Sequence, residues 1–151
     1  MCSGILAATL ALLNPEEDMP QHAIRQIATS PDPYAPFRIS QAIEAGGFVF
    51  VSGQAAMDLQ GNLVGGDDFA AQAEQAFSML ATVLEAAGSS LARVVKVTIY
   101  LTDMANFPAI VQLREKHFSR PYPADTIVQI ERLALPELQI EIDAVALARR
   151  G

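Results

Sequence analysis

Hydrophobic residues recur with helical spacing in two parts of the chain. From 67 to 87 the apolar residues follow one another at three- and four-residue steps, which predicts an amphipathic helix. Asp67 is the expected N-cap of this helix and Gly88 its C-terminal stop. A second, shorter helix is predicted over about 106–118, with Asp103 or Asn106 as its cap and Pro108 tolerated in its first turn.

Alternation with a period of two predicts strands around these helices. We expect strands over 39–44 and 48–52, joined by Ala45-Gly46-Gly47, and further strands over 95–102, about 125–131 and 138–147. Two alternating sets are expected to face the core: Val95, Val97, Ile99 and Leu101 in one strand, and Leu138, Ile140, Ile142, Ala144 and Ala146 in the last.

The order of the predicted elements favours an α+β domain. A mixed sheet with both helices packed on one face best fits the predicted order, which is strand, strand, helix, strand, helix, strand, strand. The opposite face also carries many apolar residues, so we expect it to be covered by another subunit.

Length and composition agree with a single domain. A chain of 151 residues that is 51% hydrophobic can fill a core without disulfide or metal staples, which excludes disordered, collagen-like and zinc-scaffold classes. Residues 1–19 are interpreted as a leader, arising from a start site upstream of Met19, or alternatively as a short packed helix; residues 20–151 then form the domain. The apolar stretch 5–13 is shorter than the roughly 20 residues that a membrane span needs.

Charge and metal-ligand residues exclude several functions. The net charge of −7 opposes nucleic acid as a partner, because binding to phosphates requires clustered cations. Cys2 is the only cysteine, so an intrachain disulfide is impossible, and a reducing cytoplasm fits this composition. His22 and His117 are far apart in sequence, and we expect no metal, no cofactor and no membrane partner.

Polar residues on otherwise apolar strands are the candidate site residues. Glu141, if desolvated, would have a raised pKa suited to general acid or base catalysis; a solvated strand face is the alternative. Asp125 and Thr126 follow two prolines and either lie at a pocket mouth or simply start a strand. Ser52 offers a hydroxyl and Gly53 a backbone N–H that a ligand could approach; the alternative is that the two residues simply form a turn at the strand end.

Three arginines are possible binders of a carboxylate. They are Arg38, Arg114 and Arg132, each of which is otherwise a surface cation or an ion-pair partner. His117 is interpreted as a packing residue of the second helix. The chain has no GxGxxG, P-loop, HExxH or GxSxG motif, so nucleotide, zinc-protease and serine-hydrolase functions have no local support.

Three segments together resemble the RidA (YjgF) family of reactive intermediate deaminases over residues 37–148. They are SQAIEAGGFVFVSGQ (40–54), AAQAEQAFSMLATVLEAAGSSLARVVKVTIYLTDMANF (70–107) and YPADTIVQIERLALPELQIEIDAVA (122–146). The resemblance implies a chorismate-mutase-like fold in a homotrimer, with the sheets forming an inner barrel and ligand clefts between adjacent subunits. It also implies hydrolysis of enamine and imine intermediates, such as 2-aminoacrylate, to a 2-oxo acid and ammonia, with no metal or cofactor.

The match is incomplete at the positions expected to bind substrate. Ser52, Gly53 and the water-orienting Glu141 match the family, but Asp125 stands where active members have an arginine that grips the substrate carboxylate. Ile39 and Val111 replace an aromatic and a polar residue. With aspartate in place of arginine, the interaction of residue 125 with a substrate carboxylate about 4 Å away changes from an attraction of roughly 4 kcal/mol to a repulsion of similar size. A 2-imino acid would then be a poor substrate unless Arg38 or Arg114 supplies the missing cation.

The sequence therefore predicts an imine or enamine deaminase for a neutral or cationic substrate. In this hypothesis Glu141 orients water, Asp125 recognises an amine, and the two carboxyls would share a proton if they share the cleft. A non-catalytic, ligand-binding trimer is the alternative. RNA cleavage with translation inhibition, also linked to this family, is disfavoured by the charge balance.

Overall fold

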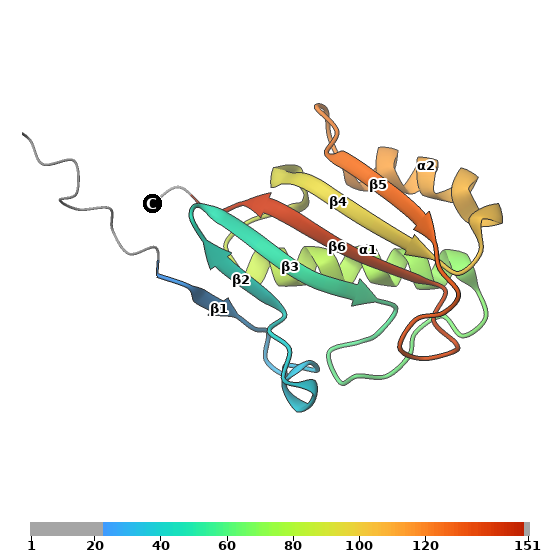
Figure 1. Ribbon diagram of the computed structural model, residues 1–151, viewed down its shortest axis with the longest axis horizontal. Coiled ribbons are helices and arrows are strands. Elements are labelled where there is room, and N and C mark those ends of the chain that lie inside the picture. The colour runs from blue at the N-terminus through green and yellow to red at the C-terminus, as the bar shows by residue number, and fades with distance from the viewer. Residues whose placement is uncertain (1–22, 150–151) are drawn as a thin grey trace, which may run out of the picture.

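Six strands form one mixed sheet in the computed structural model, which describes residues 23–149 (Figure 1). The strands are β1 (Arg25–Ile27), β2 (Ala42–Ala45), β3 (Phe48–Ala55), β4 (Val94–Leu101), β5 (Ala124–Gln129) and β6 (Ile140–Leu147). Their order in the sheet is β1-β2-β3-β6-β4-β5, and β4 and β5 are the parallel neighbours. The predicted leader (1–19), which contains Cys2 and Met19, lies outside the described residues, as does His22.

Two helices, α1 (Phe69–Ala86) and α2 (Phe107–His117), pack on one face of this sheet (Figure 1). The core between the layers contains the apolar face of α1 and the inward residues of β3, β4 and β6, as the alternation in the sequence predicts. Short 3₁₀ turns precede β2 (Ala35–Phe37), β4 (Leu91–Arg93) and α2 (Met104–Asn106). The predicted α+β fold with two helices on a mixed sheet is confirmed.

The N-cap of α1 is Asp68, so the prediction of Asp67 was wrong by one residue. The Asp68 carboxylate accepts hydrogen bonds from the backbone N–H groups of Ala70 (2.9 Å) and Ala71 (3.3 Å). Gly88 follows the helix with a φ of +73°, a left-handed conformation that favours glycine at a helix end.

The inward face of β4 begins at Val94, which corrects the prediction for Val95. The register against β6 shifts between Val94 and Lys96, so Val94 is buried and Val95 is 39% exposed. Beyond this bulge, Val97, Ile99 and Leu101 are buried as expected. Strand β1, which pairs with β2, was not predicted, because its three residues are too few to show a period.

The sheet face opposite the helices carries both polar and exposed apolar side chains. Four of its side chains are at least one-third exposed in the single chain: Phe48, Phe50, Val128 and Leu147. Cross-strand partners place Phe48 beside Leu147 and Phe50 beside Val145. We call this surface the open face. Within residues 23–149, no helix is both long enough and apolar enough to cross a bilayer.

Candidate functional site

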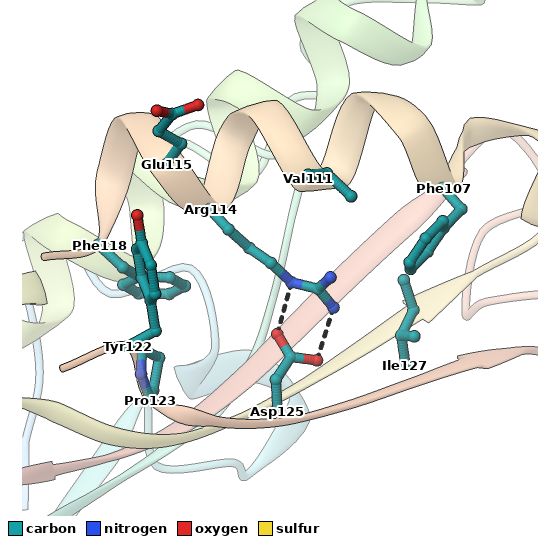
Figure 2. A pocket seen from close by; sticks show the side chains of 9 residues that line it. All are labelled: Phe107, Val111, Arg114, Glu115, Phe118, Tyr122, Pro123, Asp125 and Ile127. Atoms are coloured by element: carbon teal, nitrogen blue, oxygen red, sulfur yellow. Dashed lines mark hydrogen bonds and ion pairs between the residues drawn. The ribbon is translucent and has the colours of Figure 1, made fainter. Parts of the chain in front are cut away.

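A pocket of about 500 Å³ lies between α2 and the edge strand β5 (Figure 2). Its wall is mainly aromatic and aliphatic. The lining residues are Phe107, Val111, Arg114, Glu115, Phe118, Tyr122, Pro123, Asp125 and Ile127. The sequence had singled out Val111, Arg114 and Asp125 but missed the aromatic residues, because their neighbourhood depends on how α2 packs beside β5.

Arg114 and Asp125 form a bidentate ion pair in this pocket (Figure 2). Arg114 Nε donates to Asp125 Oδ2 and Arg114 Nη2 donates to Asp125 Oδ1, both at 2.7 Å. Only 22% of the arginine side chain and 19% of the aspartate side chain are exposed. The guanidinium carbon also lies 5.6 Å from the centre of the Phe107 ring, within cation–π range.

The strand register explains why Asp125 reaches α2. Asp125 lies beside Val97 in the parallel β4–β5 pair, and Val97 is a buried residue on the helix side of the sheet. Arg114 lies one turn after Val111 on α2, above the same edge of the sheet. Both side chains therefore point into the space between helix and strand.

Glu141 lies on the open face, on the other side of the sheet. It pairs with Ala55 of β3 and Tyr100 of β4, between the inward-facing Ile140 and Ile142. Burial raises the pKa of the Glu141 carboxyl above its usual range, and the charge of Asp143 raises it further. Asp143 itself accepts a hydrogen bond from the Tyr100 hydroxyl at 2.9 Å.

Gly53 makes room for the Glu141 carboxylate. A Cβ atom built on Gly53 would lie 2.0 Å from Glu141 Oε1, so a side chain at position 53 would require the Glu141 side chain to shift. The close approach coincides with an irregularity in β3, whose register against β6 shifts between Val51 and Gln54. Glycine therefore allows this close contact with a carboxylate, and backbone conformation is not the reason for it, since its φ is not in the left-handed region.

Ser52 and Tyr34 hold the backbone around Gly53. Ser52 Oγ donates to the carbonyl of Ser40 (2.7 Å), and the Tyr34 hydroxyl donates to the carbonyl of Gly53. Burial and the nearby charges of Glu141 and Asp32 raise the pKa of Tyr34 to about 12, so its hydroxyl remains a donor at neutral pH. No local pattern marked Tyr34 as a site residue; it lies in the proline-rich loop 30–36 before β2.

The remaining predicted residues lie apart from both groups or at their margins. Thr126 faces the open side of β5, where its hydroxyl accepts a hydrogen bond from Lys96 Nζ at 3.1 Å. Ile39 and Arg38 are exposed in the loop that carries Tyr34, and Arg132 is exposed between β5 and β6. His117 stacks on Phe77 with ring centres 4.5 Å apart, which is a packing role.

Within one chain the predicted site residues fall into two groups on opposite faces of the sheet. Asp125, Arg114 and Val111 line the pocket under α2, whereas Ser52, Gly53 and Glu141 lie together on the open face. Asp125 and Glu141 therefore do not share a cleft in the single chain. Among residues 23–149, no group of three or more His, Cys, Asp and Glu side chains is placed to hold a metal ion.

Comparison with known proteins agrees with this architecture. The family model described as Endoribonuclease L-PSP matches residues 27–148. A RutC family protein of Pyrococcus horikoshii is 40% identical over 118 residues, which are 78% of this chain and 90% of the relative. A 2-iminobutanoate/2-iminopropanoate deaminase of Dermatophagoides farinae is 32% identical over the same shares of the two chains.

Solved structures extend the likeness to the fold. The crystal structure of RidA from the Antarctic bacterium Psychrobacter sp. superposes with a TM-score of 0.74 at 36% identity, covering 82% of this chain and 98% of that chain. Sequence and fold thus agree over almost the whole length that the structure describes, and the chain belongs to the RidA/YjgF family.

Proposed function

We propose that this protein is a hydrolytic deaminase of imine and enamine metabolites that works as a homotrimer. The observation that carries the proposal is the half-buried Glu141 carboxyl on the open face, pressed against the backbone of Gly53. No ion pair to Glu141 forms within residues 23–149, so its proton affinity is set by burial and by Asp143. The relative named 2-iminobutanoate/2-iminopropanoate deaminase supports the same class of reaction.

The cleft in this proposal is formed by two subunits. Because the Arg114–Asp125 pocket and Glu141 lie on opposite faces of one sheet, a ligand can touch both only where two copies meet. The exposed apolar side chains of the open face, such as Phe50 and Leu147, supply surface for that contact. A trimer would place the pocket of one subunit beside the Glu141 of the next.

Glu141 activates water in the proposed reaction. Its ionised carboxylate accepts a proton from water as the water oxygen bonds to the imine carbon, and it passes this proton to the nitrogen. The resulting carbinolamine loses ammonia when its C–N bond breaks and its hydroxyl proton passes through Glu141 to the nitrogen, leaving a carbonyl product and an ionised Glu141. Raising the pKa of Glu141 makes it a stronger base for the first step.

The ion pair revises the substrate preference expected from the sequence. Both oxygens of Asp125 accept hydrogen bonds from Arg114, whose positive charge compensates the carboxylate. Asp125 therefore neither repels an anion as a lone carboxylate would nor binds an amine as one would. Arg114 is one of the two cations, with Arg38, expected as a replacement, but its charge is balanced by Asp125. We therefore favour neutral imines as substrates.

Ammonia release from imines generated by amino-acid and amine oxidases tests the proposal. The intact protein should accelerate release, and Glu141→Gln should lower the rate at least about a hundredfold, as loss of a general base does. Because the ionised carboxylate is required, the rate should rise with pH through a pKa above the usual glutamate range, and Glu141→Gln should lack this limb. Glu85→Gln, an exposed change on α1, is the matched control.

Equal rates for the intact protein, Glu141→Gln and the blank would contradict the proposal. Metabolite binding without turnover would instead support the non-catalytic trimer. RNA cleavage remains disfavoured, since the net charge of −7 leaves little attraction for phosphates.

A further inference from the structure

The two charges in the α2–β5 pocket neutralise each other but keep hydrogen-bonding capacity. Arg114 uses Nε and Nη2 for Asp125, which leaves the N–H groups of Nη1 and one of Nη2 unspent. Each Asp125 oxygen accepts one of these bonds and retains a further lone pair. Figure 2 shows the pair at the centre of the pocket, between the Phe107 and Tyr122 side chains.

We propose that the Arg114–Asp125 pair makes this pocket selective for an uncharged ligand. The ligand would have a planar group with a donor beside an acceptor, as in a primary amide or a neutral imine, and an apolar or aromatic side chain. The planar group would accept from Arg114 and donate to Asp125, while the side chain packs against Phe107 and Tyr122. Arg114 and Asp125 are then specificity-determining residues.

Charge complementarity is the reason for this selection. A carboxylate that approached Arg114 would also meet the like charge of Asp125. An ammonium group would gain from Asp125 but meet the Arg114 guanidinium. An uncharged dipolar group satisfies both partners and requires no loss of ionic hydration. About one-fifth of each side chain is exposed in the single chain, so solvent screens these differences in part.

The inference rests on the proposed function in that it takes this pocket as part of the substrate cleft. Its test needs no turnover. We would titrate the full chain with three probes that share one branched alkyl group, isovaleramide, isovalerate and isoamylamine, and follow binding by NMR. Isovaleramide should bind at least about tenfold more tightly than either charged probe.

Removing the charge of Arg114 or of Asp125 should leave the charge of its partner uncompensated. Asp125→Asn should shift the preference at least about tenfold toward isovalerate, and Arg114→Gln should shift it equally toward isoamylamine. The double variant Arg114→Gln/Asp125→Asn should prefer isovaleramide again, which a merely structural role of the pair would not produce. Lys116→Gln, which removes a cation of the same helix outside the pocket, should leave all three affinities within about twofold.

Equal affinities of the three probes for the intact protein, or no detectable binding of isovaleramide, would overturn the inference. So would single variants that fold normally and keep the original preference. If Glu141→Gln abolishes ammonia release while the probes are not discriminated, the inference fails and the proposed function stands. If the probes are discriminated but no imine is hydrolysed, the proposed function fails alone.

Discussion

The missing Cβ atom of Gly53 leaves room for the candidate catalytic carboxylate. Gly53 has an ordinary φ, and the space that a side chain would occupy is filled by Glu141 Oε1. The neighbouring Ser52 hydroxyl and Tyr34 hydroxyl fix the backbone on either side through carbonyl groups. The space at this one backbone position thereby permits the observed place of the Glu141 carboxylate.

Replacing Gly53 with alanine should displace the Glu141 carboxylate. We expect Gly53→Ala to lower the free energy of unfolding by about 1–3 kcal/mol, as overpacking does, measured by urea denaturation. In a Glu141→Ala background the clash is removed, so the same substitution should cost clearly less. Equal costs in the two backgrounds would show that the clash is relieved without Glu141.

At the scale of elements, the cap of α1 is a local feature that the sequence nearly located. Asp67 and Asp68 are adjacent, and both are acceptable caps by residue type, but only Asp68 bonds the N–H groups of the first turn. The Asp67 carbonyl instead accepts a hydrogen bond from Gln139 Nε2.

Asp68→Ala should therefore lower the free energy of unfolding by about 1 kcal/mol through loss of the cap. Asp67→Ala is the matched control, with an expected change within about 0.5 kcal/mol, because its recorded contact uses the backbone. Thermal or urea unfolding measures both. A larger loss for Asp67→Ala than for Asp68→Ala would contradict this assignment of the cap.

The elements were predictable where periodicity is long and unpredictable where geometry is set by a neighbouring strand. The apolar face of α1 and the alternation of β6 both follow from sequence, and the buried sides agree. The register shift that turns Val95 outward arises in the pairing of β4 with β6, so no local signal marks it. The Arg114–Asp125 pair likewise joins a helix to a strand, and the sequence could offer Arg114 only as one of three candidate cations.

At the scale of the whole molecule, the sheet separates the two halves of the candidate site. The pocket under α2 holds a neutralised ion pair and aromatic walls, and the open face holds Glu141. A second subunit is therefore needed for both halves to act on one ligand. The open face also carries exposed large apolar side chains, Phe50 at 48% among them.

Phe50→Glu should separate the subunits and abolish catalysis together. Sedimentation equilibrium of the intact protein should give about 49 kDa, which is three times 16.2 kDa, and Phe50→Glu should shift the mass toward that of the monomer. The reason is that each interface would lose apolar contact, worth about 1–2 kcal/mol for a half-exposed phenylalanine, and would bury an unpaired carboxylate. Ammonia release should fall to the level of Glu141→Gln although Glu141 is intact.

Ser78→Glu, which adds the same charge at an exposed position of α1, should keep the trimer mass and the activity. A monomeric intact protein that still hydrolyses imines would show that one half of the site is sufficient, and would remove the reason for assigning the cleft to two subunits.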